Sequence, residues 1–358
     1  MRSLIALGLT GLLTFGAATV PAAGALPSTS SSYSGIIAAA PISMQVSPTG
    51  QYTMRGKLLG FAFRHKGVTS DTGVESDAFV VTLYGGLVKV PVDLEFTISD
   101  DTEKIDGTVM FTLNGQPTTL PFSLFKSFPY TKDSPAPQTG RHVIVFEPGD
   151  GTTPVPGRGV ATVKVSAIGA VKVTGKLADG AKITSSGNLS KDGIFRIVSS
   201  PYGRYGYFAG FARFEGDNTE NVINWGRFTS SRERIFEGTL ISLIHRYIPP
   251  VAGTPALVFG NADNSAPLNL YGGGLTTNIA LTIRLDTANK LTVVGENAPK
   301  LQLALNPKTG LISGTMNLEI NGVLQRHILR LVILQDETAA RGFFDSPQPS
   351  PNADFGPL

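Results

Sequence analysis

One stretch of the chain combines the residue types that bind sugars. In residues 201–214, tyrosine, phenylalanine and arginine alternate with glycine, and the chain's single tryptophan follows soon after. Exposed tyrosine and tryptophan rings stack on sugars or bases, and arginine adds hydrogen bonds or a cation–π contact. The candidate ligand-binding residues are Tyr202, Tyr205, Tyr207, Trp225 and Arg227.

The same stretch also has a purely structural interpretation. Glycine alternating with aromatic residues lets a curved sheet bend while the rings fill its interior. Alternation along Tyr205-Gly206-Tyr207 places both tyrosines on one face of a strand and Phe208 on the other. We expect Phe208 and Trp225 to lie in a core, and the tyrosines stay open between core and stacking surface.

No reactive constellation accompanies these residues. The four histidines, His65, His142, His245 and His327, occur singly and without metal-ligand spacing, and the chain has no cysteine. No G-x-S-x-G elbow or P-loop is present. We therefore predict no catalytic residue, no metal and no cofactor. A net charge of +3, from 30 basic and 27 acidic residues, gives no argument for a nucleic-acid partner.

The first 25 residues have the order of an export signal. Met1 and Arg2 precede an apolar run over residues 4–20, and small residues end at Ala25. We predict a cleaved signal peptide over 1–25 and a secreted or cell-surface protein, with the periplasm as an alternative location. No later apolar run is long enough for a spanning helix, so no membrane span is expected after cleavage.

The composition after the signal is that of many short strands joined by tight turns. The chain has 41 glycines and 24 prolines, and Val, Ile, Leu, Thr and Phe occur between them in short runs. Asn114-Gly115 and Asn321-Gly322 predict type I′ hairpin turns in equivalent places of two repeats. The predicted fold class is all-β, with antiparallel hairpin and meander repeats forming barrel-like or sandwich domains.

Similar openings near Tyr33, Gly140 and Gly253 divide the chain into repeated segments. Pro-rich stretches precede the second and third openings and mark natural joints. We predict a disordered linker over 26–32, β-repeat segments over 33–136, 137–248 and 249–346, and a disordered tail over 347–358.

Short motifs within these segments carry a resemblance. They are Gly56-Lys-Leu58, Gly175-Lys-Leu-Ala-Asp-Gly180 and Leu189-Ser-Lys-Asp-Gly193. In them the chain resembles uncharacterised secreted, Gly-rich β-repeat proteins of planctomycete and verrucomicrobial bacteria. The resemblance implies a β fold and export, and it implies no activity or ligand. The first segment departs from the usual short form, because residues 64–78 have the composition of an inserted polar loop.

Two classes of function remain after these exclusions. The first is an exported, non-enzymatic envelope, matrix or adhesion protein with a glycan-contacting surface, whose partner is a cell-surface or extracellular polysaccharide. The alternative is a secreted carbohydrate-active enzyme or its accessory carbohydrate-binding domain, which requires two carboxylates and several aromatic rings to meet in one cleft.

Overall fold

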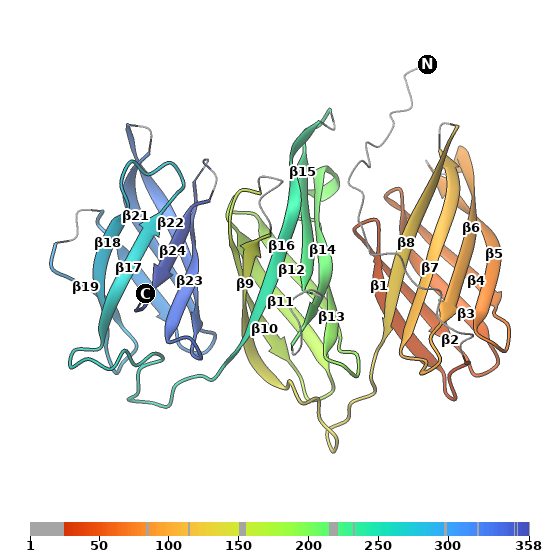
Figure 1. Ribbon diagram of the computed structural model, residues 1–358, viewed down its shortest axis with the longest axis horizontal. Coiled ribbons are helices and arrows are strands. Elements are labelled where there is room, and N and C mark those ends of the chain that lie inside the picture. The colour runs from red at the N-terminus through yellow and green to blue at the C-terminus, as the bar shows by residue number, and fades with distance from the viewer. Residues whose placement is uncertain are drawn as a thin grey trace.

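The computed structural model describes residues 25–83, 86–113, 115–149, 155–214, 221–231, 233–296, 299–320, 322–346, 348 and 350–357. It contains three antiparallel sheets of eight strands each, every one curled into a nearly closed barrel, and the barrels stand in a row (Figure 1). The all-β prediction is confirmed, in its barrel form. Residues 1–24 of the predicted signal peptide lie outside the described residues. Among the described helices, none is long and apolar enough to span a bilayer.

The first barrel comprises β1 (Ser31–Ile37), β2 (Ala40–Val46), β3 (Gln51–Leu58), β4 (Phe61–Val68), β5 (Val74–Leu83), β6 (Val88–Ile98), β7 (Lys104–Leu113) and β8 (Gln116–Lys126). The second comprises β9 (Gly140–Pro148), β10 (Gly159–Val165), β11 (Ala170–Leu177), β12 (Lys182–Asn188), β13 (Ile194–Ser199), η2 (Gly203–Tyr205), β14 (Gly206–Arg213), β15 (Val222–Phe228) and β16 (Arg234–Tyr247). The third comprises β17 (Ser265–Tyr271), β18 (Ile279–Leu285), β19 (Leu291–Val294), β20 (Gln302–Asn306), β21 (Leu311–Ile320), β22 (Val323–Leu334), β23 (Ala339–Phe344) and β24 (Asn352–Phe355).

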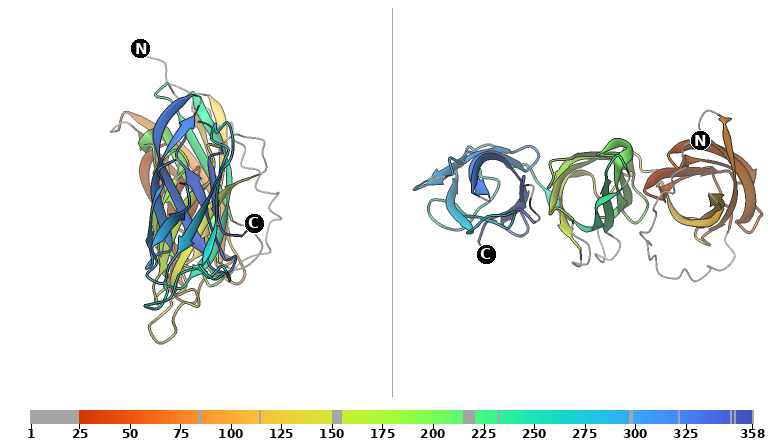
Figure 2. Two further views of the ribbon diagram at one scale, coloured as in Figure 1. Left: turned by 90° about the vertical axis from the view of Figure 1, so that its left-hand side faces the viewer. Right: turned by 90° about the horizontal axis from the view of Figure 1, so that it is seen from above.

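Each barrel is an up-and-down meander whose first and last strands pair. β1 pairs with β8, β9 with β16, and β17 with β24, all antiparallel. The hydrogen-bonded order therefore follows the sequence round the ring and is interrupted once in each barrel, between β4 and β5, β12 and β13, or β19 and β20. Viewed from above, the three sheets appear as three rings side by side (Figure 2).

Polar side chains bridge the interrupted seam of the first barrel. The Tyr52 hydroxyl donates to Asp77 Oδ2 over 2.5 Å, and His65 Nε2 lies 2.6 Å from the same oxygen. A Cβ on Gly67 would lie 2.5 Å from the Tyr52 ring, so glycine leaves the room that this cluster needs. The inserted loop predicted over residues 64–78 is therefore wrong: the segment forms β4 and the start of β5, because polar residues face inward where they pair with one another.

The barrel interiors are filled by apolar side chains. In the second barrel Phe146, Phe208 and Trp225 are completely buried, and the Trp225 ring meets Phe236 edge-on at 4.8 Å between centroids. The expectation that Phe208 and Trp225 belong to a core is confirmed. Strand alternation then directs the intervening residues to the outer surface, so any ligand site built on strands must use the outer faces or the barrel ends.

The two predicted Asn-Gly turns are two-residue hairpin loops. Leu113 pairs with Gln116 and Ile320 with Val323, and the loop glycines Gly115 and Gly322 have φ of +77° and +75°. Asn114 and Asn321 lie outside the described residues. Their predicted equivalence is wrong, because β7–β8 is the last hairpin of its barrel whereas β21–β22 joins a fifth and a sixth strand. What repeats is the local hairpin, since its turn chemistry works at any place in a meander.

Both predicted disordered ends contain ordered residues. Ser31 and Ser32 belong to β1, and Leu26 packs against the first barrel's core. At the other end, Asn352–Phe355 form β24 between β17 and β23, with Ala353 and Phe355 buried. Disorder over 26–32 and 347–358 was predicted from polar composition, and it is wrong for these residues because alternate apolar side chains and a free sheet edge suffice to recruit a strand.

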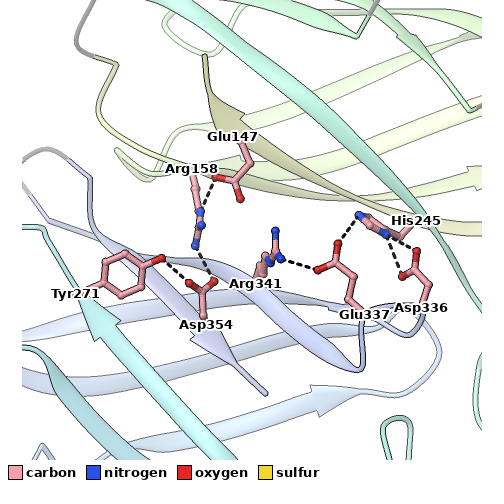
Figure 3. A network of polar contacts seen from close by, with 8 residues as sticks. All are labelled: Glu147, Arg158, His245, Tyr271, Asp336, Glu337, Arg341 and Asp354. Atoms are coloured by element: carbon pink, nitrogen blue, oxygen red, sulfur yellow. Dashed lines mark hydrogen bonds and ion pairs between the residues drawn. The ribbon is translucent and has the colours of Figure 1, made fainter. Parts of the chain in front are cut away.

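Packed junctions hold neighbouring barrels together. Val143, Val145 and Val160 face outward from the second barrel and share one apolar cluster with the third. Beside them, Arg158 pairs with Glu147 at 2.6 Å and with Asp354 at 2.7 Å (Figure 3). Figure 3 also shows His245 of β16 reaching Asp336, at 2.8 Å, on the β22–β23 loop. At the other junction, Phe125 and Phe211 meet edge-on at 5.0 Å.

Candidate functional site

Three of the five predicted ligand-binding residues meet at one end of the second barrel. The Trp225 indole Nε1–H donates to the Tyr202 hydroxyl over 3.0 Å, and the Arg227 guanidinium lies 4.9 Å from the centre of the Tyr202 ring. The Tyr202 hydroxyl in turn donates to Asp179, in the β11–β12 turn, and Arg227 Nη1 lies 3.6 Å from that carboxylate. Asp179 is the member of this cluster that the sequence reasoning missed.

The side chains of this cluster bind one another, and we call it the closed cluster. Trp225 is completely buried and so has no face to offer a sugar, and one face of the Tyr202 ring is occupied by Arg227. Burial, together with the hydrogen bond to Asp179, raises the pKa of Tyr202 well above its usual value, so the hydroxyl stays protonated and keeps donating. The cluster therefore fits a role in positioning the β13–β14 loop.

Tyr205 and Tyr207 lie apart from that cluster and from each other. Tyr205 ends the short helix η2, so the extended Tyr205–Tyr207 segment predicted from alternation is wrong. The Arg204 guanidinium lies 4.9 Å from the Tyr205 ring centre. Tyr207 stands on β14, packs over Gly226 and donates to Glu237 on β16. The five residues thus do not form one stacking surface, and sugar binding by Tyr205 or Tyr207 stays a prediction.

A different surface of the same barrel gathers residues of one chemical kind. Val163, Val165, Val171 and Val173 point into the core, so Lys164 and Lys172, which alternate with them, point outward. The ladders place Lys164 directly opposite Arg141 on one side and Lys172 on the other. Lys172 pairs in turn with Ser186, and Arg196 lies alongside, its Cγ 3.9 Å from an ideal Cβ on Gly187.

We call Arg141, Lys164, Lys172 and Arg196 the cation row. It crosses strands β9 to β13, and Ser186 occupies its β12 position. Paired strands lie about 4.8 Å apart, so the three paired spacings from β9 to β12 cover about 14 Å, and Arg196 lies beyond them across the interrupted seam. A second row runs parallel to it two residues along the strands: Thr162 pairs with Thr174, and Thr174 with Thr184. We call these three residues the threonine row.

A cleft lies at each end of the cation row. Towards the third barrel, a cleft is lined by Arg141, Lys164, Lys172, the first two threonines of the row and Thr309 from the β20–β21 loop. Towards the first barrel, another is lined by Lys172, Arg196, Thr184, Ser186 and Pro41 of β2. Lys172 belongs to both, so the two clefts form one continuous surface across the middle barrel.

The cation row has little compensating negative charge. Strands β9 to β12 carry one acidic residue, Glu147, and Arg158 binds it. Within the described residues, no carboxylate lies within 4.0 Å of any member of the row. Arg196 donates to the carbonyls of Gly35, at 3.4 Å, and Ile42, at 3.1 Å, and burial lowers the pKa of its guanidinium. Like charges facing each other across a ladder destabilise a sheet, so this row opposes folding.

The sequence contained a signal for this surface. The pattern Val-Lys-Val occurs at residues 163–165 and 171–173, either side of a tight turn ending in Gly169, and this spacing places the two lysines opposite each other. Arg141 and Arg196 lie too far along the chain for such a local argument. Throughout the described ranges, no group of three or more His, Asp or Glu side chains is arranged to hold a metal.

Comparisons with known proteins give no family for the chain. No family model and no curated protein matches it. Among solved structures, AofleA from Arthrobotrys oligospora is similar over 90% of this chain and 88% of its own, with 11% identity and a TM-score of 0.17. A tail fiber of a Staphylococcus aureus phage is similar over 87% of this chain and 62% of its own, with 8% identity and a TM-score of 0.10. TM-scores this low carry no inference, and the resemblance to secreted Gly-rich repeat proteins stays a prediction.

Proposed function

We propose that this protein is an exported adhesion or matrix protein that holds a polysaccharide on the outside of its middle barrel. The observation that carries the proposal is the pair of rows on β9 to β13, whose residues line two clefts that share Lys172. Threonine and serine hydroxyls both donate and accept hydrogen bonds, as sugar hydroxyls do, and arginine and lysine add donors.

The packed junctions support a holding function. Apolar contacts and the Arg158 ion pairs fix the third barrel against the second, so Thr309 stays beside the cation row. A preformed site spares the ligand the cost of ordering it. Both clefts are lined without aspartate or glutamate, so they do not offer the pair of carboxylates that glycoside hydrolysis requires.

The test is a binding screen of the purified chain against a panel of neutral, sulfated and uronate-containing polysaccharides. Variants of the β9–β13 face are compared with variants of the tyrosines. We expect binding that Thr174→Val weakens and Tyr205→Ala leaves unchanged. Absence of binding to every polysaccharide, or release of soluble sugar fragments, would contradict the proposal.

A further inference from the structure

The charge pattern of the β9–β13 face specifies the kind of polysaccharide. Resting on the proposed function, we infer that the ligand is a linear polyanion, a polysaccharide with sulfate or carboxylate groups, that lies along the cation row from the third barrel's cleft to the first barrel's cleft. The anionic groups would then supply the negative charge that the protein itself does not provide there.

The first argument is the direct opposition of like charges. Arg141, Lys164 and Lys172 occupy consecutive rungs of one ladder row, where a carboxylate partner would be the ordinary stabilising choice. A bound anion between them converts repulsion into attraction. The same residues line a cleft, so a single anionic group can approach more than one of these cations.

Hydrogen-bond donors without an acidic partner lie at both ends of the row and point the same way. At the third barrel's end, Thr309 Oγ1 is buried and has no hydrogen-bond partner among the described residues, and it lines the cleft with the three cations. At the first barrel's end, the guanidinium of Arg196 is held by carbonyl oxygens alone. Both are donors suited to an anionic oxygen.

The threonine row distinguishes a polysaccharide from a nucleic acid. Single-stranded nucleic acids bind where aromatic rings stack on bases, and neither cleft is lined by Phe, Tyr or Trp. His142 lines the third barrel's cleft, but it is buried and its ring packs against Phe214 at 4.5 Å between centroids. Three threonines lie beside the line of cations, and the Thr162 hydroxyl also donates to the Thr174 carbonyl over 3.3 Å. Their hydroxyls instead suit a chain that carries hydroxyl and anionic groups on every unit. The paired part of the row, about 14 Å over three strand spacings, accommodates more than one such unit.

The test compares dextran sulfate with unmodified dextran, two polymers that share a backbone and differ in charge. We expect dextran sulfate to bind, with an affinity that falls as salt rises, and dextran to bind far more weakly. Carboxymethyl dextran, in a third arm, shows whether carboxylates serve as well as sulfates. Polyuridylate is the nucleic-acid arm, and binding of it as tight as dextran sulfate would overturn the assignment to a polysaccharide.

A triple variant tests the location. Arg141→Ala, Lys164→Ala and Lys172→Ala together should weaken dextran sulfate about 10- to 100-fold, since each lost exposed ion pair accounts for about 2- to 5-fold. The matched control is Lys89→Ala, Arg284→Ala and Lys290→Ala, three exposed cations on the first and third barrels that remove the same charge. Equal losses in both triples would show that net charge alone drives binding and would overturn the site.

Two further measurements separate loss of binding from unfolding, and this inference from the proposed function. Removing like charges should leave the urea midpoint of the cation-row triple unchanged or raised, so lost binding cannot be ascribed to unfolding. Thr309→Val should weaken binding by about 2- to 10-fold, the contribution of one hydrogen bond, without any change in charge. Binding of neutral dextran through this face with no preference for its sulfate would refute the inference while leaving the proposed function standing.

Discussion

The hydrogen bond between Trp225 and Tyr202 allows a quantitative test of the second barrel's interior. Tyr202→Phe removes the hydroxyl that accepts from Trp225 Nε1 at 3.0 Å and leaves that completely buried N–H without its partner. An unsatisfied buried donor costs about 1 to 3 kcal/mol. A domain of this size loses about 2 kcal/mol of stability per molar urea, so the unfolding midpoint should fall by about 1 M.

Trp225 is the chain's single tryptophan, so its fluorescence reports unfolding of the second barrel alone. The control is Tyr205→Phe, whose hydroxyl accepts only from the exposed Arg204 and whose loss should change the midpoint by less than about 0.3 M. If Tyr202→Phe and Tyr205→Phe unfold at the same urea concentration as the parent, the buried hydrogen bond does not contribute to stability and the closed cluster is refuted.

Three further predictions concern other parts of the fold. Gly115→Val and Gly322→Val force a β-branched residue to φ near +77° and +75°. Each should lower the free energy of unfolding by about 1 to 3 kcal/mol. An unchanged melting temperature in calorimetry would show that the loops tolerate side chains. Burial alone would raise the pKa of Asp77, but hydrogen bonds from Tyr52 and His65 outweigh it and lower the pKa. The stability that this lowered pKa contributes is present above the unfolded carboxyl's usual pKa of about 3.9 and is lost as the pH falls through the folded pKa. Asp77→Asn should therefore flatten the acid side of a plot of melting temperature against pH. An unchanged acid side would contradict the role of this cluster in closing the seam. Deleting residues 347–358 removes β24 and should lower the third barrel's melting temperature by more than 5 °C, which a native-like melt would disprove.

Local pattern was enough for much of this fold and failed where partners come from elsewhere in the chain. The Asn-Gly turns and the Val-Lys-Val strands could be predicted because turn geometry and alternation involve neighbouring residues. The segment with Arg64, His65 and Lys66 was misassigned because only His65 faces inward, where it pairs with Asp77 of the next strand, while Arg64 and Lys66 are exposed. β24 was missed because its pairing partners, β17 and β23, complete a ring that composition does not reveal.

The candidate site shows the same division. The alternation of glycine with aromatic residues was enough to expect Trp225 in a core, although the residue was also a candidate for ligand binding. The cation row needs the register of four strands and a fifth strand across the seam, and its Thr309 edge needs the junction between two barrels. The aromatic residues led to the prediction of a ligand site at one end of the barrel. The charges that distinguish its outer face are spread over residues 141–196, at spacings that only the folded meander brings into line.

Lysine labelling in the presence of polymer tests the central claim most directly. The chain is acetylated under limiting conditions with dextran sulfate or with dextran, and the modification of each lysine is measured by mass spectrometry. Lys164 and Lys172, both exposed on the cation row, should be protected by dextran sulfate alone, while Lys89 and Lys290, which are also exposed, keep their reactivity. Protection of Lys89 and Lys290 to the same degree, or none at Lys164 and Lys172 at saturating dextran sulfate, would contradict the assignment of the ligand to this face.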